Sequence, residues 1–368
     1  MEELIFNKSP APTIGVELEL QILDSDTLEL TSHAPKLLDM VPISLKERIK
    51  AEFIQSMIEI NTEVCATVAE VERDLKDTFS FLQGLTESLG GTIFAVSLHP
   101  FSRGDAQKVS EDPRYKRIMD DLQMVGRRFI TQGLHVHIGI DDEAKVIKVN
   151  NSLRIHLPLL LALSTSSPFY ESVDTGLMSY RAKLFEALPL AGMPDSLRDW
   201  NEFNNLVQLL KMGGIIQTVK DLWWDVRPHP DFGTIEIRIC DLPYSLRDIL
   251  AITALIQSLV LTLAEEDEMP EPHSQILRSN KWQAARYGLE GVFVDPYSAQ
   301  KHSMKEAVKS LYEMVKPVSE MLKSTEYLDE VHEILKRTTG AHIQKEQYYR
   351  NGNDFQAMIK SVQRMFLK

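Results

Sequence analysis

Three short segments of the chain combine a purely apolar strand face with a face of charged or imidazole side chains. They are TIGVELEL at residues 13–20, GLHVHIGI at residues 133–140 and FGTIEIRICD at residues 232–241. Successive side chains of an extended strand point to opposite faces, so alternate residues share a face. The polar faces carry, in order, Glu17 and Glu19, His135 and His137, and Glu236 and Arg238. The pattern predicts a sheet with one face in the core and one polar face that suits a cation and a phosphate.

The carboxylates of these strands are candidate ligands for a divalent cation. Magnesium takes oxygen ligands and is held in phosphoryl-transfer sites by a few carboxylates plus the phosphates. Glu59, in the apolar segment QSMIEINT, joins the set. A carboxylate in such a segment must be neutralised or solvated. The alternative is that each glutamate faces solvent on an open antiparallel sheet, with Arg238 pairing one of them.

The two histidines alone do not identify a metal, because the HxH pattern on a strand also serves zinc and iron. Glu52 is a further candidate, seven residues before Glu59. That spacing places the two on opposite faces of an unbroken strand. We therefore expect both to reach one site only through a bulge or a helix-to-strand break.

Several common enzyme classes have no support in the sequence. The chain contains no Walker A motif, no GxGxxG motif and no GxSxG nucleophile elbow. Its two cysteines, Cys65 and Cys240, are too few and too far apart for a disulfide framework, which favours a reducing compartment. Both are expected to be buried as small hydrophobic residues rather than to act as nucleophiles.

The composition is that of an ordinary soluble globular protein, with 43% hydrophobic and 25% charged residues among 368. The formal net charge of −13 disfavours partners that need a basic surface, namely nucleic acid and anionic membrane. The N-terminus does not look like a secretory signal. The apolar tracts at 157–163 and 259–264 are far shorter than the ~20 residues that span a bilayer. We expect a cytoplasmic protein with no membrane partner.

Hydrophobic periodicity and turn residues predict helices and strands in alternation, followed by a helical end. Loops are expected over 101–113 and 165–192, the second with a composition that often surrounds a site. This order predicts an α+β fold with a largely antiparallel sheet, in a single domain over residues 1–368 whose C-terminal third is mostly helical. The expected helices cover residues 34–40, 69–89, 113–128, 143–163, 246–265, 300–323 and 354–366.

Six motifs in order resemble those of the carboxylate-amine ligases of the glutamate-cysteine ligase type 2 family. They are GVELEL, QSMIEINT, GLHVHIGI, SPFYESVDTGLMSYR, FGTIEIRICD and NKWQAARYGLEG, and they extend from residue 13 to residue 291. The resemblance implies a glutamine synthetase-like fold, in which a curved antiparallel sheet and surrounding helices form a half-open funnel for ATP and divalent cations. Leu18 departs from relatives that have a third consecutive acidic residue. It points to the core by parity, so metal ligation should survive.

The resemblance also implies roles for individual residues. Arg238 would contact the transferred phosphate and act with Glu236 in catalysis, and either Mg²⁺ or Mn²⁺ would serve. His135 stays open as an alternative to His137. One metal would be held by Glu19, Glu52 and Glu59, the second by Glu17, His137 and Glu236, and substrate or ATP by Arg181, Asn61, Asn280 and Arg286.

The implied reaction is ATP-dependent formation of an amide bond through an acyl phosphate. The partners would be small amino acid substrates: a carboxylate such as glutamate and an amine such as cysteine. Two alternatives remain open, a non-catalytic member of the fold that binds nucleotide or amino acid, and a metal-dependent hydrolase. The hydrolase fits poorly, because such sites need further histidines and an aspartate at later strands of a parallel barrel. Exposed sheet edges leave a homodimer open.

Overall fold

A central antiparallel sheet organises the chain in the computed structural model, which describes residues 4–267 and 270–368. The strand order is β10-β11-β5-β1-β3-β2, and β4 pairs with the far half of β1. The strands are β1 (Ile14–Asp24), β2 (Ile49–Ala51), β3 (Met57–Asn61), β4 (Gly91–Phe94), β5 (Leu134–Gly139), β10 (Val226–His229) and β11 (Thr234–Ile237). The predicted α+β fold with an antiparallel sheet is confirmed.

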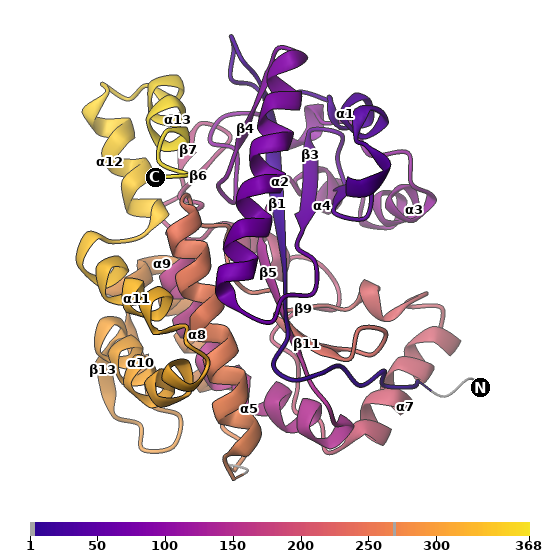
Figure 1. The fold of residues 1–368 in the computed structure, drawn as a ribbon, viewed down its shortest axis with the longest axis vertical. Coiled ribbons are helices and arrows are strands. Elements are labelled where there is room, and N and C mark those ends of the chain that lie inside the picture. The colour runs from indigo at the N-terminus through magenta and orange to yellow at the C-terminus, as the bar shows by residue number, and fades with distance from the viewer. Residues whose placement is uncertain (1–3, 268–269) are drawn as a thin grey trace.

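One face of the sheet is the core face. Ile14, Val16, Leu18 and Leu20 of β1 are all buried there, as their parity predicted. Three long helices cover this face: α2 (Val68–Ser88), α5 (Glu143–Ser164) and α8 (Leu246–Glu265). Figure 1 shows α2 in front of β1, with α5 and α8 beside it.

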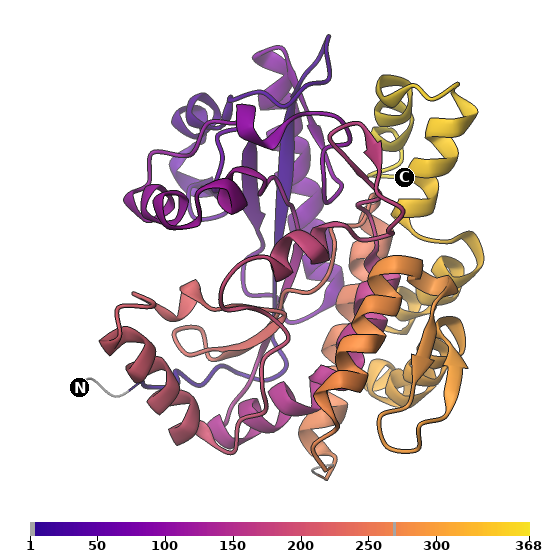
Figure 2. The ribbon, with the colours of Figure 1, turned by 180° about the vertical axis from the view of Figure 1, so that it is seen from behind.

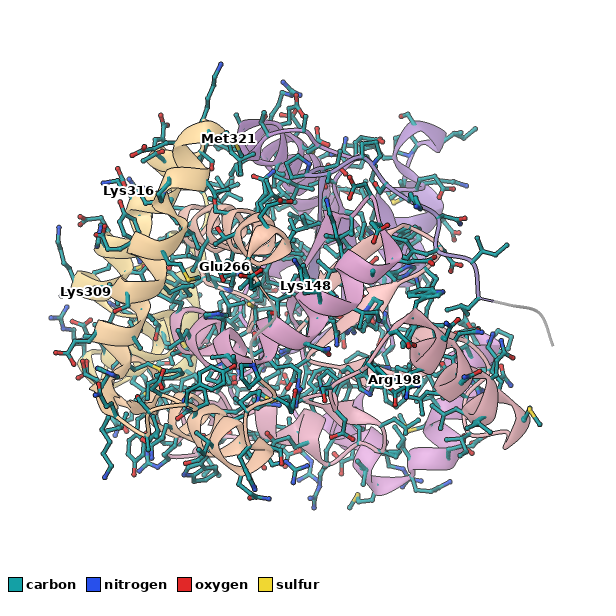
Figure 3. The ribbon with its side chains drawn as sticks, turned by 90° about the horizontal axis from the view of Figure 1, so that it is seen from below. Lys148, Arg198, Glu266, Lys309, Lys316 and Met321 are labelled. Carbon is teal, nitrogen blue, oxygen red and sulfur yellow. The ribbon has the colours of Figure 1, made fainter. Side chains whose placement is uncertain are left out.

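Helix α8 is long and apolar enough to cross a membrane by length and composition, with a mean hydropathy of 1.7. The sequence analysis considered only its apolar tract at 259–264. In the structure 83% of the apolar window is buried inside the protein. Its hydrophobicity is therefore explained by its position in the core, between α5, α10 and α11. Near its end, Lys148 Nζ of α5 donates to the Glu266 carbonyl at 2.9 Å (Figure 3).

The C-terminal part of the chain forms a helical layer beside α8 (Figure 1). It contains α9 (Ser274–Tyr287), the hairpin of β12 (Val292–Val294) and β13 (Lys301–Ser303), then α10 (Met304–Met321), α11 (Thr325–Arg337), α12 (Gly340–Arg350) and α13 (Phe355–Gln363). Helix α10 starts later than predicted because Ser303 and Glu306 form a capping box at its N-terminus. Lys309 and Lys316 project from its outer side (Figure 3).

Shorter elements border the polar face of the sheet, which Figure 2 shows from its open side. The helix predicted over 113–128 is broken at Gln123, whose φ is 48°, into α3 (Pro113–Leu122) and α4 (Met124–Arg127). The segment predicted as a loop contains α6 (Arg181–Glu186) and the short strands β6 (Phe169–Tyr170), β7 (Val173–Asp174) and β8 (Ala191–Gly192). The remaining elements are α1 (Ala34–Met40), α7 (Trp200–Met212) and β9 (Trp223–Trp224).

Candidate active site

The polar face of the sheet brings the predicted strand residues together in rows that cross neighbouring strands. Residues directly opposite one another in antiparallel strands lie within side-chain contact. The pairs are Glu19 with Glu59, Glu17 with His135, and Glu236 with His137. The register of the strands therefore brings together, on both sides of β1, the side chains that strand alternation predicted on one face.

Glu19, Glu52 and Glu59 form what we call the acidic site. Strands β2 and β3 are a hairpin in which Lys50 lies opposite Glu59. Glu52 follows Lys50 by two residues, and this parity gives it the same face. The prediction that a bulge or a helix-to-strand break joins Glu52 to Glu59 was wrong, because the chain reverses direction between them.

Three carboxylates crowd one another in the acidic site, where Glu19 is buried and Glu52 and Glu59 are half-buried. Burial raises the pKa of Glu19 to about 7, although the nearby charge of Arg181 partly offsets it. Burial raises the pKa of Glu59 to about 6. Burial, then the charges of Glu19 and Glu59, raise the pKa of Glu52 well above its usual range. The protein does not supply enough positive charge to neutralise these three carboxylates. A divalent cation would supply the missing charge.

Glu17, His137 and Glu236 form a second group, which we call the histidine site. His137 Nε2 lies 3.3 Å from a Glu17 oxygen and 3.9 Å from a Glu236 oxygen. Its Nδ1 is 3.0 Å from the Thr234 hydroxyl. A ligating histidine is typically oriented in this way by a partner on its other nitrogen. Burial would raise the pKa of Glu17, but the adjacent imidazoles of His135 and His137 hold it well below its usual range.

His135 lies between the two sites. Its Nδ1 is 3.3 Å from Glu17 and its Nε2 is 3.8 Å from Glu19. Burial, then the charge of Arg238, lower the pKa of His135 to about 4, so the ring is neutral. Ligand atoms of His135, Glu17 and Glu236 also lie within 4.8 Å of one another. The Nε2 atoms of His135 and His137 are both buried without a hydrogen-bond partner among the described residues.

Two arginines hold Glu236. Arg227 Nε donates to one carboxylate oxygen at 2.6 Å, and Arg238 contacts the other. Burial would raise the pKa of Glu236, but these two guanidinium groups hold it well below its usual range. The Nε of Arg238 is buried and has no partner in the part of the chain that the structure describes. Arg238 therefore has a free donor beside an ionised glutamate.

A cleft opens over both sites. Its polar lining includes all of the acidic site and the histidine site, together with His135 and Arg238. Arg227 and His229, which the sequence analysis missed, also line it; they alternate along β10 as the predicted residues do along their strands. Phe232 stacks on His229 with ring centroids 4.2 Å apart, at the side of His137.

The structure places the other predicted contacts differently from one another. Arg181 begins α6, is buried, donates to the carbonyls of Ile239 and Arg238, and lies near Glu19. Asn61 donates to Glu59 at 2.7 Å. None of these four predicted residues is in the lining of the cleft. In α9 the side chain of Asn280 bonds to the backbone of Val294, and that of Arg286 to the Gly176 carbonyl. The role of all four as ligand contacts stays a prediction.

Comparison with known proteins gives consistent results over nearly the whole chain. The model of glutamate-cysteine ligase family 2 matches residues 13–363. A relative from Gloeobacter violaceus with the name "Putative glutamate--cysteine ligase 2" is 38% identical, with coverage of 93% of this chain and 94% of the relative. A relative of the same name from Solibacter usitatus is 36% identical and covers 95% and 92%.

Two solved structures show the same fold at low sequence identity. The glutamate–cysteine ligase of Francisella tularensis in complex with AMP has a TM-score of 0.71 at 15% identity and covers 98% of this chain and 89% of that chain. The bifunctional glutathione synthetase from Pasteurella multocida has a TM-score of 0.68 at 15% identity and covers 96% and 52%. The fold that the sequence resemblance implied is thus confirmed.

Proposed function

The chain belongs to glutamate-cysteine ligase family 2, and from this premise we propose that it is an ATP-dependent carboxylate-amine ligase that forms an amide bond through an acyl phosphate. One observation carries the proposal: two groups of carboxylates and imidazoles converge on one cleft, next to an arginine with an unpartnered donor. The substrates would be amino acids, with glutamate as the first carboxylate to test. We propose a cytoplasmic location.

The donor set fits magnesium. Hard divalent cations prefer carboxylate oxygens, and the acidic site offers three carboxylates whose pKa values are raised chiefly by burial. The histidine site offers two carboxylates and a buried imidazole nitrogen without a partner. Magnesium held there would offset the negative charge of the phosphates. Glu19, Glu52 and Glu59 would hold one ion, and Glu17, His137 and Glu236 the other.

The reaction proceeds in two displacements. An oxygen of the substrate carboxylate attacks the γ-phosphorus of ATP, the bond to the β,γ-bridging oxygen breaks, and ADP leaves. The amine nitrogen then attacks the acyl carbon, the bond to the phosphate oxygen breaks, phosphate leaves, and the amine proton passes to solvent. No covalent bond to the enzyme forms.

The side chains of this protein contribute position and charge to these displacements. Arg238 lines the cleft, where its guanidinium would offset the charge of the transferred phosphoryl group. Arg227 keeps Glu236 ionised and fixed in orientation. Thr234 fixes the ring of His137. Arg181, beside Glu19, would contact nucleotide or substrate.

Hydroxylamine trapping tests the proposal. Hydroxylamine is a small, general nucleophile that converts an acyl phosphate to a hydroxamate, so it reports the first displacement whatever the natural amine is. Purified protein with Mg²⁺, ATP and a panel of amino acid carboxylates should release ADP and form hydroxamate together. Glu236→Gln should abolish both without loss of the folded state. Amide cleavage without ATP would instead support the hydrolase, and ATP binding without turnover on any carboxylate would support a binding protein.

A further inference from the structure

One end of the cleft is built from apolar and aromatic side chains. We call this end the aromatic pocket and define it as Phe53, Tyr115, Ile118, Leu122, Phe129 and Phe185, all of which line the cleft. The rings contact one another in series: centroids are 5.6 Å apart for Phe53 and Tyr115, 6.3 Å for Phe53 and Phe129, and 4.6 Å for Phe129 and Phe185. Such a surface binds a ligand through apolar area and ring contacts.

The aromatic pocket adjoins the acidic site. The backbone N–H of Phe53 donates to a Glu52 carboxylate oxygen at 2.9 Å. Tyr115 lines the same cleft as Glu19, Glu52 and Glu59, and burial, followed by the charges of Glu52 and Glu59, raises the pKa of Tyr115. The guanidinium of Arg181, which lies near Glu19, stacks on Phe185 at 4.5 Å. A ligand in the aromatic pocket therefore reaches the acidic site directly.

The acidic site suits a cationic group better than a phosphate. Its three carboxylates carry more negative charge than one divalent cation removes, although Lys50 and Arg114 also line the cleft. Amines arrive as cations, and both carboxylates and aromatic faces attract cations. The opposite end carries Arg227 and Arg238, with the stacked His229 and Phe232 at its side. The triphosphate belongs with the arginines, and the amine with the aromatic pocket.

We propose that the acceptor substrate is a primary amine with an aromatic or branched apolar body, which fills the aromatic pocket, and that the enzyme prefers it to cysteine. This inference rests on the proposed ligase function. Cysteine carries one methylene and a thiol, too small to cover a surface made by six apolar side chains. Phe129 and Phe185 are half-buried, so a fitting amine would bury ring surface that now faces solvent.

The expected discrimination follows from ordinary pocket energetics. A single methylene in an apolar pocket changes kcat/KM by roughly 10- to 200-fold. A phenethyl or 3-methylbutyl group is larger than the side chain of cysteine by several methylene-sized groups. We therefore expect kcat/KM for phenethylamine or 3-methylbutylamine to exceed that for cysteine by at least about 10-fold.

The test begins with the carboxylate that gives hydroxamate in the trapping assay. Phenethylamine, 3-methylbutylamine and cysteine then replace hydroxylamine, with amide identified by mass spectrometry. A phenethylamine preference supports the inference. If hydroxamate forms but cysteine is the best acceptor, the inference is overturned and the ligase function stands. If no carboxylate gives hydroxamate, the ligase function fails. Calorimetry in the presence of Mg²⁺ and ADP then tests the aromatic pocket separately, because the inference predicts that phenethylamine binds at least about 10-fold more tightly than cysteine.

Two variants assign the effect to the aromatic pocket. Phe129→Ala should lower kcat/KM for phenethylamine at least about 10-fold and improve 2-(1-naphthyl)ethylamine relative to phenethylamine. A gain on the larger amine cannot come from misfolding. Phe232→Ala removes the same ring at the opposite end and should leave the ratio between acceptors unchanged. If Phe129→Ala raises KM for ATP while the ranking of amines stays the same, the pocket holds the nucleobase and the inference is wrong.

Discussion

Arg227 offers a quantitative test of how the histidine site is held together. Its Nε donates to Glu236 at 2.6 Å, and its Nη1 donates to the carbonyls of Leu222 and Val219 at 2.7 and 3.1 Å. The side chains of the Arg227–Glu236 pair are 5% and 1% exposed. Breaking a buried pair by removing one partner costs about 3–5 kcal/mol, because the other charge stays buried. Arg227→Met should therefore lower the free energy of unfolding by about that amount.

A double-mutant cycle separates the charge pair from the rest of the arginine's contacts. In the Glu236→Gln background Arg227 has already lost its charged partner, so Arg227→Met should cost no more than the two lost carbonyl hydrogen bonds, about 1–3 kcal/mol. The coupling between the two sites is then about 2 kcal/mol. Urea unfolding of the four proteins without divalent cations measures it. Effects that add to within about 0.5 kcal/mol would refute the claim that Arg227 neutralises Glu236.

Three further predictions follow from individual contacts. The pKa of Glu52 is raised in the folded protein, so the stability that its protonated form contributes at low pH is lost as the pH rises toward that pKa. Without divalent cations, the melting temperature of Glu52→Gln should therefore exceed that of the wild type by a margin that grows from pH 5 to pH 8. A margin that stays constant over this range would contradict the crowding of the carboxylates. Lys281→Met leaves buried Asp225, now bonded to Lys281 Nζ at 2.6 Å, without its partner, and should lower the free energy of unfolding by about 3–5 kcal/mol, with partial recovery on adding Asp225→Asn. A Cβ on Gly133 would lie 2.3 Å from an Arg181 nitrogen, so Gly133→Ala should displace that flexible side chain and reduce ligase activity at least about 10-fold, whereas Gly84→Ala, in open space on α2, should leave activity unchanged.

Strand parity predicted most of the site because it depends only on local geometry. Glu17, Glu19 and His137 lie where alternation placed them, since each strand is buried on its other face and cannot slip by one residue. The sequence could not say which strands are neighbours, and that depends on the whole fold. The register then supplied the pairing of Glu236 with His137.

Two features were hidden by weak local signals. The turn between β2 and β3, over residues 52–56, contains no glycine, proline, asparagine or aspartate, and Ser56 alone is too weak a turn signal to indicate a hairpin. Arg227 and His229 alternate like the other site residues, but Pro228 between them argued against a strand. β10 tolerates this proline because it is an edge strand of the sheet.

Isotope transfer tests the central claim most directly. The carboxylate substrate that supports hydroxamate formation is labelled with ¹⁸O in both carboxyl oxygens and incubated with the protein, Mg²⁺, ATP and the best amine. Formation of an acyl phosphate moves one of these oxygens to phosphorus, so the account predicts one ¹⁸O atom in each phosphate released with amide. Unlabelled phosphate would mean that water attacks ATP and that the cleft does not activate a carboxylate.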